Sequence, residues 1–427
     1  MGKHIYMSMI HKKYTAHKNV IENFLWRVLQ ICGKQIVVFL VFTVCSRLLT
    51  PLEFGKYNYI LAGIFFLMIF CDFGISTATG KYVAEWKAID PDRFKIFIFN
   101  GVILVLLLST IVLIVTIAVF RVWFPENSKY LLFAIPLVIF YPLTALYDGI
   151  YRGMQRFKEL SIITIVVGTV SAVLMVFFVK IWGVNGALFS QGFFYFILFA
   201  VLFIKHKEFL AIFDIGVIKE ISKYSFVLGV SNVAYYLYTR MDVIILGQFG
   251  FVKEVSYYEI VNQIFLLTLL PFRILAQVMA PVVTGLMAQR KIDVIVAKHK
   301  KSRMMIPFAV VFTLAIYLIL PCILDVVYKK YSTPEMLQAF SILIFVLPIK
   351  IWGVYQTQAF IVATGEARLI ARATVIGGIL NVIMDCVCIY LMGYIGVFVS
   401  TVIVHIGCIM VVDAIYSRRL SSMGAKI

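Results

Sequence analysis

The sequence predicts an all-α polytopic membrane protein whose twelve transmembrane helices form two lobes of six. The chain of 427 residues is 62% hydrophobic and only 14% charged, and its mean hydropathy is +0.98. Its apolar residues form long runs: residues 98–120 carry no charge and are long enough to cross a hydrocarbon core of about 30 Å. The two halves of the sequence also resemble each other. A large soluble helical core would need polar outer faces, which these runs lack.

Apolar runs of this kind recur along the whole chain and define the predicted spans. In order they are 26–48, 57–78, 96–120, 130–150, 160–180, 184–204, 224–247, 255–285, 304–328, 336–361, 370–391 and 395–416. Lys and Arg concentrate in the termini and in the loops on one side. By the positive-inside rule this side is cytoplasmic, so both termini are expected in the cytoplasm and the number of spans must be even. The net charge of +18 therefore reflects membrane topology and does not indicate a nucleic-acid partner.

Several classes of protein are disfavoured by what the sequence lacks. The N-terminal residues 1–19 are basic and polar, without the apolar stretch of a cleaved signal peptide. All seven cysteines fall in apolar segments and none forms a CxxC pair, so neither a disulfide framework nor a metal site is expected. We find no nucleotide-binding loop, metal-ligand cluster or nucleophile motif. The sequence therefore predicts a protein that is not an enzyme and needs no cofactor.

The chain divides into two lobes of similar length. We expect an N-lobe at 1–205 and a C-lobe at 224–427, joined by a basic amphipathic linker at 206–223. The linker would lie on the cytoplasmic leaflet with its cations toward anionic headgroups, although a partner-binding helix is an alternative.

A weak internal repeat supports this division. Residues 151–190 resemble residues 362–401. The aligned pairs are Gly153 with Gly365, Arg156 with Arg368 and, after a shift of two, Gly183 with Gly393 and Gly186 with Gly396. Glycine at these turns permits a sharp helical hairpin or close helix packing. Two parallel repeats of six spans suit a transporter whose lobes rock around a central cavity.

Three cations lie near the middle of predicted spans. Lys34 is in the first span, Arg273 in the eighth and Lys350 in the tenth, and the last two follow Pro271 and Pro348 by two residues. A charge at the bilayer centre costs about 2.5–3.5 kcal/mol or more, so each is a functional hypothesis. We expect them to line a water-filled cavity for an anionic substrate, because Arg and Lys both bind phosphate groups.

A fourth cation, Arg240, is expected in the outer part of this cationic path, in the seventh span. Asp72, Asp242 and Asp385 are candidates for ion coupling or for structural pairing. Structural ion pairs remain an alternative for the cations: Lys34 with Asp72 or Asp385, and Arg240 with Asp325.

Four segments in order resemble one family. They are 46–60, 71–85, 240–264 and 363–403, with sequences SRLLTPLEFGKYNYI, CDFGISTATGKYVAE, RMDVIILGQFGFVKEVSYYEIVNQI and ATGEARLIARATVIGGILNVIMDCVCIYLMGYIGVFVSTVI. Each resembles the corresponding segment of bacterial polysaccharide repeat-unit flippases of the O-antigen translocase type. These belong to the multidrug/oligosaccharidyl-lipid/polysaccharide exporter superfamily, and the resemblance covers about 25–420.

The resemblance implies two six-helix lobes in an inverted V that work by alternating access. It implies that undecaprenyl-diphosphate-linked oligosaccharide is moved from the inner to the outer leaflet of the bacterial inner membrane, for O-antigen or another surface polysaccharide. It further implies coupling to an H+ or Na+ gradient, contact with membrane lipids, and a polysaccharide polymerase and chain-length regulator as partners. The family motifs are mostly structural turns and assign no substrate residue.

Three alternatives remain open. A multidrug cation antiporter of the same superfamily needs acids in its lumen, often in the first span, where this chain has Lys34. A lipid-linked sugar polymerase or ligase usually carries a large external loop with basic catalytic residues, which is not predicted here. A flippase for the peptidoglycan-precursor lipid should have spans beyond twelve.

Overall fold

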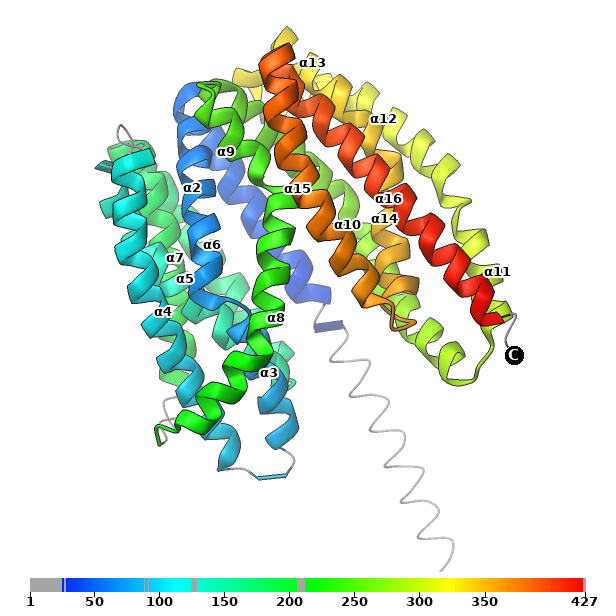
Figure 1. Ribbon diagram of the computed structural model, residues 1–427. Coiled ribbons are helices and arrows are strands. Elements are labelled where there is room, and N and C mark those ends of the chain that lie inside the picture. The colour runs from blue at the N-terminus through cyan, green and yellow to red at the C-terminus, as the bar shows by residue number, and fades with distance from the viewer. Residues whose placement is uncertain are drawn as a thin grey trace, which may run out of the picture. The chain divides into compact units, whose positions relative to one another are not determined.

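The protein is a helical membrane protein. The computed structural model describes residues 25–26, 28–87, 89–90, 92–123, 129–205 and 212–424, and no strand occurs among them (Figure 1). Within this part of the chain, eleven helices are long and apolar enough to cross a membrane. The predicted all-α, multi-pass fold is thus confirmed. The first part of the expected linker, 206–211, lies outside the described residues.

The eleven helical spans coincide with eleven of the twelve predicted ones. They are Val28–Leu48, Pro51–Trp86, Arg93–Val122, Leu131–Gly153, Phe157–Trp182, Val184–Lys205, Val252–Ala288, Ile292–Val327, Pro334–Ile361, Ala367–Met392 and Ile395–Met423. The expected span at 224–247 is also helical, as α8 (Ile215–Thr239) and α9 (Met241–Gln248), interrupted at Arg240. This segment is not among the eleven apolar spans because α8 is rich in polar residues and because the helix is interrupted between α8 and α9.

By packing, the chain forms two compact units. Unit 1 comprises the residues up to Val44 and Leu67–Gly229, and unit 2 comprises Cys45–Phe66 and Val230 onward. The helices α2 (Pro51–Asp72) and α8 therefore each belong partly to one unit and partly to the other. The lobe boundaries at 205 and 224 stay a prediction about topology.

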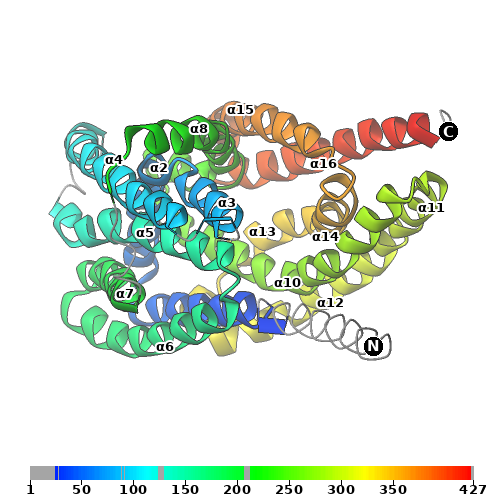
Figure 2. The ribbon, with the colours of Figure 1, turned by 90° about the horizontal axis from the view of Figure 1, so that it is seen from below.

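Unit 1 is built from helices that pack around buried aromatic and aliphatic side chains. Its helices include α3 (Ile75–Trp86), α4 (Arg93–Trp123), α5 (Leu131–Gly153), α6 (Phe157–Trp182) and α7 (Val184–Lys205) (Figures 1 and 2). The core includes Phe97 and Tyr147, both almost fully buried. α3 and α5 meet at Gly80 and Gly149, where an added Cβ would overlap with the opposite backbone. Small residues at such a contact let membrane helices approach closely.

Unit 2 contains α9 and the helices that follow it. The helices after α9 are α10 (Val252–Ala288), α11 (Ile292–Ser302), α12 (Met305–Val327), α13 (Pro334–Leu343), α14 (Leu347–Gln356), α15 (Ala367–Met392) and α16 (Ile395–Gly424), with short turns η3 (Lys329–Tyr331), η4 (Ile344–Val346) and η5 (Thr357–Ile361). The segment Cys45–Phe66 packs within this unit: the Tyr236 hydroxyl donates to the Ala62 carbonyl at 2.6 Å, and the Tyr59 ring lies against Gly247.

The internal repeat is visible in the local backbone. Gly183 and Gly393 both end a helix with positive φ, 54° and 64°. Three residues later, Gly186 and Gly396 each leave no room for a Cβ beside the preceding helix. The predicted alignment of these two pairs is confirmed, and glycine is required because L-residues rarely adopt such a φ and because the helices touch.

The alignment of the preceding turn is wrong by two residues. The positive φ that precedes α6 is at Gln155 (59°), not Gly153, and it corresponds to Gly365 (87°) before α15. Arg156 and Glu366 then occupy the same N-cap position. The sequence alignment pairs Gly153 with Gly365, but the two glycines have different roles. Gly153 is needed for the close contact with Gly80 and not for a turn.

Candidate functional site

Two buried carboxyl groups in unit 2 come together around one asparagine. Asp242 lies in the first turn of α9, where the interruption at Arg240 starts a new helix and its N-terminal dipole favours an anion. Asn381 and Asp385 lie four residues apart on α15 and so share a face. The Asn381 Nδ2 group donates to Asp242 Oδ1 and to Asp385 Oδ2, each at 3.1 Å. All three side chains are fully buried.

Small residues bring the helices close enough for these contacts. On α15, Gly377 and Gly378 face α8, where an added Cβ would crowd the Tyr238 ring and the Ala234 carbonyl. Close approach of α15 at this point places Asn381, one turn further on, beside Asp242.

Hydroxyl groups from α16 complete the cluster. The Thr401 hydroxyl donates to Asp242 Oδ1 at 2.9 Å, and the Ser400 hydroxyl donates to Asp385 Oδ1. Both hydroxyls also contact the Val397 carbonyl. The Tyr258 hydroxyl of α10 lies beside Asp242 and Thr401. We call Asp242, Asn381, Asp385, Ser400 and Thr401 the acidic cluster.

The acidic cluster has more acceptors than donors. Among the described residues, the buried atoms Asp242 Oδ2 and Asn381 Oδ1 have no hydrogen-bond partner. The carboxyl groups of Asp242 and Asp385 interact with each other directly, which two ionised carboxylates could not do favourably in a buried site. The cluster therefore has the chemistry to hold one positive charge, either a proton shared between the carboxyl groups or a cation bound by oxygen atoms.

Three of the four predicted cations also lie in unit 2 and are electrostatically linked. Lys350 on α14 is half-buried and interacts with Arg273, Arg240 and Asp242. Arg273 on α10 is also half-buried. Three cations and the acidic cluster thus form one charged region, in which Asp242 attracts Lys350 and the two arginines repel it.

Arg240 forms an ion pair that the sequence did not predict. Its guanidinium donates to Glu259 Oε1 of α10 at 2.5 Å, and the Glu259 side chain is 8% exposed whereas that of Arg240 is 38% exposed. The structure therefore pairs Arg240 with Glu259 rather than with Asp325, whose carboxylate accepts from the Ser332 hydroxyl at 2.7 Å. Arg240 therefore takes part in this ion pair and also interacts with Lys350 of the cationic region.

The remaining two predicted residues lie in unit 1. Asp72 ends α2, and after Phe73 and Gly74, both with positive φ, it accepts from the backbone N–H of Ser76 at 2.8 Å and from the Ser76 hydroxyl at 2.9 Å. It therefore caps the start of α3. Lys34 is exposed on the helix Val28–Leu48 and has no hydrogen-bond or ion-pair partner among the described residues.

Sequence reasoning missed most of the uncharged members of the site. Asn381, Ser400 and Thr401 do not stand out individually because polar uncharged residues are common in membrane helices. His405 on α16 was missed too: it is buried, stacks on the Tyr238 ring with centroids 4.2 Å apart, and interacts with Lys350. The spacing of Asn381, Asp385, Ser400 and Thr401 across one tight glycine turn was the signal that could have found them.

No conventional transition-metal centre is visible in the described residues. All seven cysteines are free thiols. Within the same part of the chain, no group of three or more His, Cys, Asp or Glu side chains could hold a metal ion.

The comparisons with solved structures establish the fold. An inward-facing multidrug resistance MATE family transporter of the MOP superfamily matches with a TM-score of 0.78 and 15% identity, over 93% of this chain and 99% of that one. A Vibrio cholerae MATE transporter matches with a TM-score of 0.65 and 12% identity, over 95% and 97%. A MOP superfamily transporter from Pyrococcus furiosus, described as having a binding pocket of reverse polarity, matches with 0.62 and 15%, over 95% and 96%.

The comparison with protein families is more specific. No curated protein matches the chain. The family model described as polysaccharide biosynthesis protein matches residues 20–287, which is more than half of the chain. The chain belongs to the polysaccharide biosynthesis protein family and has the fold of the MOP superfamily transporters.

Proposed function

We propose that this protein is a flippase for lipid-linked oligosaccharides. It carries undecaprenyl-diphosphate-linked repeat units from the inner to the outer leaflet of the bacterial inner membrane, where they are used for O-antigen or another surface polysaccharide. Both termini then lie in the cytoplasm. Membership of the polysaccharide biosynthesis family supports the substrate class, and the transporter fold supports movement across the membrane.

The observation that carries the proposal is the charged region of unit 2. Lys350, Arg273 and Arg240 interact there, and only Arg240 among them has an acidic ion-pair partner within the described residues. Arg273 repels Lys350, and a diphosphate bound beside them would offset this repulsion. Arg supplies a planar fork for phosphate oxygens and Lys a point charge. That Lys34 contributes a further cation stays a prediction.

The acidic cluster is proposed to couple transport to an ion gradient. A buried site with two carboxyl groups takes up one H+ or Na+ readily, because an uncompensated second negative charge is costly there. Lys350 interacts with Asp242, so the charge held by the acidic cluster changes the electrostatic potential at the substrate cations. Ion binding and substrate binding would thereby influence each other.

Transport by the purified protein tests the function. Proteoliposomes would contain the protein and a fluorescent undecaprenyl-diphosphate oligosaccharide in both leaflets, and a membrane-impermeant reagent would follow the outer leaflet. We expect lipid movement that needs the protein and increases with an imposed ion gradient. In cells, deletion of the gene should trap lipid-linked repeat units in the inner leaflet and remove the surface polysaccharide. Normal surface polysaccharide in a deletion strain without another flippase would refute the assignment.

Export of cationic drugs is the competing function, because MATE transporters share the fold. Their similarity to this chain, at 12–15% identity, supports the fold only. A region with Lys350 and Arg273 repels a cationic drug. Efflux of a cationic dye from the same proteoliposomes should therefore be no faster than from empty liposomes.

A further inference from the structure

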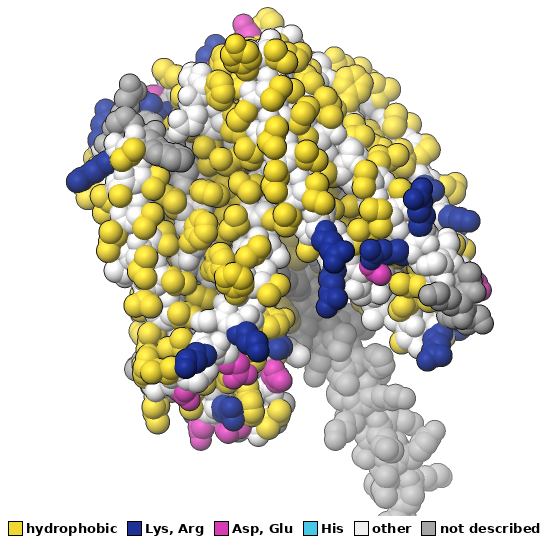
Figure 3. Space-filling model, viewed as in Figure 1, with side chains coloured by type: hydrophobic (Ala, Val, Ile, Leu, Met, Phe, Trp, Pro, Cys, Tyr) yellow, Lys and Arg dark blue, Asp and Glu magenta, His cyan; other side chains and the backbone are white. Residues whose placement is uncertain are grey.

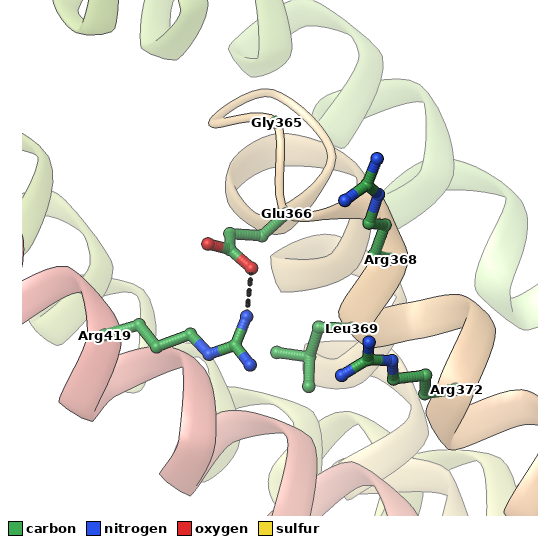
Figure 4. Close-up of a pocket in the computed structure, with 6 residues that line it drawn as sticks. All are labelled: Gly365, Glu366, Arg368, Leu369, Arg372 and Arg419. Carbon is green, nitrogen blue, oxygen red and sulfur yellow. Dashed lines mark hydrogen bonds and ion pairs between the residues drawn. The ribbon is translucent and has the colours of Figure 1, made fainter.

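A second cationic site lies at the end of unit 2 where α15 begins and α16 ends. It is an open pocket with a volume of about 450 Å³ (Figure 4). Its lining residues are Gly365, Glu366, Arg368, Leu369, Arg372 and Arg419. In Figure 3, Lys and Arg side chains gather at this end of unit 2, whereas the middle of α12, α15 and α16 is covered by hydrophobic side chains. None of the lining residues belongs to the charged region described above.

Among the described residues, one of the three arginines of this pocket forms an ion pair and the other two do not. Arg419 Nη1 lies 2.5 Å from Glu366 Oε2, which ties α16 to the start of α15. Arg368 and Arg372 are exposed and have no ion pair or hydrogen bond among the described residues. Figure 4 shows the Arg372 and Arg419 guanidinium groups pointing toward each other, with Leu369 between them. Like charges in this arrangement favour an anion between them.

The backbone adds to the positive potential. Gly365 adopts a φ of +87°, which reverses the chain immediately before α15 and places Glu366 at the N-cap position, where its side chain makes no hydrogen bond to the helix. The first turn of α15, which carries Arg368 and Leu369, therefore opens into the pocket with the positive end of its helix dipole. With three arginines and one glutamate, the side chains give a net charge of two positive units.

An apolar stripe continues from the pocket along α15. At helical spacing after Arg368 and Arg372 come Ile376, Leu380 and Ile383, whose exposed fractions are 59%, 45% and 53%. Residues four or three apart share a helix face, so the arginines and the stripe lie on one line. A ligand that fits both parts has an anionic head and a long apolar chain, which is the chemistry of a membrane lipid.

We propose that this pocket binds the diphosphate of a polyprenyl-linked substrate at the cytoplasmic leaflet, with the polyprenyl chain lying along the apolar stripe. The net charge matches a sugar-linked diphosphate, which carries about two negative charges, better than an ordinary phospholipid with one phosphodiester charge. The pocket would hold the substrate before it reaches Arg273 and Lys350. This inference rests on the proposed function for its substrate, but the binding it describes is measured without transport.

Site-specific photolabelling tests the proposal. The probe is a polyprenyl diphosphate with a diazirine in its lipid chain, added to the purified protein in phosphatidylcholine nanodiscs. We expect peptide mapping to find label on α15 around Ile376–Ile383, and unlabelled undecaprenyl diphosphate to displace it. If phosphatidylglycerol at equal concentration displaces the label as well, the pocket is a phospholipid site and the proposal is wrong.

Three variants sharpen the test. Arg368→Gln/Arg372→Gln should reduce α15 labelling by about tenfold, because it removes two charge-assisted contacts and leaves the Arg419–Glu366 pair intact. Arg418→Gln is the matched control, since Arg418 is an exposed neighbour outside the pocket, and it should label as wild type. Glu366→Gln should label more strongly because it releases Arg419. Thermal unfolding in the same nanodiscs checks that each variant is folded.

The outcomes separate this site from the transport function. Equal labelling in Arg368→Gln/Arg372→Gln and Arg418→Gln would overturn the pocket, even if the wild type transports normally. A wild type that moves no lipid-linked oligosaccharide in proteoliposomes, but labels α15 as expected, would retain the pocket and refute the flippase assignment.

Discussion

Asp242 of α9 and Asp385 of α15 accept hydrogen bonds from the same amide nitrogen, Asn381 Nδ2, at 3.1 Å each. Both carboxyl groups are fully buried, and each has a further hydroxyl donor from α16. A buried pair that shares donors in this way cannot ionise fully without a compensating charge. This geometry is the basis of the proposed coupling role, in which the pair would bind and release one cation or proton.

Asp385→Asn should uncouple transport from the ion gradient. The amide keeps the shape of the side chain but removes the charge that attracts the ion, so we expect gradient-driven flipping to fall by about tenfold or more. Flipping rates in proteoliposomes with imposed Na+ or pH gradients measure this. Asp325→Asn is the matched control, because Asp325 lies in the same unit but is exposed and accepts a hydrogen bond from the Ser332 hydroxyl, away from the acidic cluster. Equal gradient dependence in both variants would count against a coupling role.

Asn381→Ala should lower the stability of the protein. The substitution removes the donor shared by two buried carboxyl groups, and the loss of hydrogen bonds to such groups costs about 1–3 kcal/mol. Thermal unfolding in detergent should show a lower midpoint, and raising the concentration of the coupling ion should restore part of the loss, because the ion stabilises only the folded form. A midpoint equal to that of the wild type would mean that Asn381 does not hold the carboxyl groups together.

Lys350→Ala and Arg273→Ala should each strongly reduce transport without reducing the amount of folded protein. Each removes one of the interacting half-buried cations from the proposed substrate path. Flipping should decrease by about ten- to a hundredfold, as expected when a charge-assisted contact to phosphate worth about 1.5–3 kcal/mol is lost. Lys298→Ala, at an exposed position on α11, is the matched control. Transport at the wild-type rate in both Lys350→Ala and Arg273→Ala would disprove the cationic path.

A charge exchange separates the two roles open to Arg240. Arg240→Ala leaves the nearly buried Glu259 carboxylate without its partner and should destabilise the protein by about 1–3 kcal/mol. Arg240→Glu/Glu259→Arg restores an ion pair, and thermal unfolding should recover. If transport recovers with it, Arg240 is structural; if stability recovers but transport does not, a cation is needed at this position for the substrate.

The helices could be predicted from the sequence because they depend on local properties. A run such as 98–120 is apolar for its whole length, and no tertiary contact is needed to make α4 a span. The same holds for the turn at Gly183 and Gly186, whose repeat at Gly393 and Gly396 has the same geometry. In contrast, α8 and α9 contain polar residues and are separated by a break at Arg240. The length and hydropathy of the segment therefore predict this span less well.

The site was harder to predict than the helices, because the residues that contact one another in it are distant in sequence. Asp242 and Asp385 were recognised as intramembrane acids, but their contact depends on how α15 packs against α8 at Gly377 and Gly378. For Arg240 the sequence leaves open an ion pair with Asp325 as the alternative to a place in the cationic path, whereas the structure places Glu259 of α10 beside it. Depth along a helix can be counted from the sequence, but the direction in which a side chain points depends on packing.

Two glycines of α16 should respond in opposite ways to alanine. A Cβ on Gly396 would overlap with the Cys388 carbonyl, so Gly396→Ala must push α16 away from α15 and should cost about 1–3 kcal/mol. Gly407 has open space around its Cβ position, so Gly407→Ala should be neutral or stabilising by up to about 1 kcal/mol, since alanine favours the helix. Thermal unfolding of the two variants measures the difference.

Gly186→Ala, the equivalent change in unit 1, should behave like Gly396→Ala because its Cβ would meet the Phe178 carbonyl in the same way. If Gly186→Ala is as stable as Gly407→Ala, the two hairpins are not equivalent in their packing.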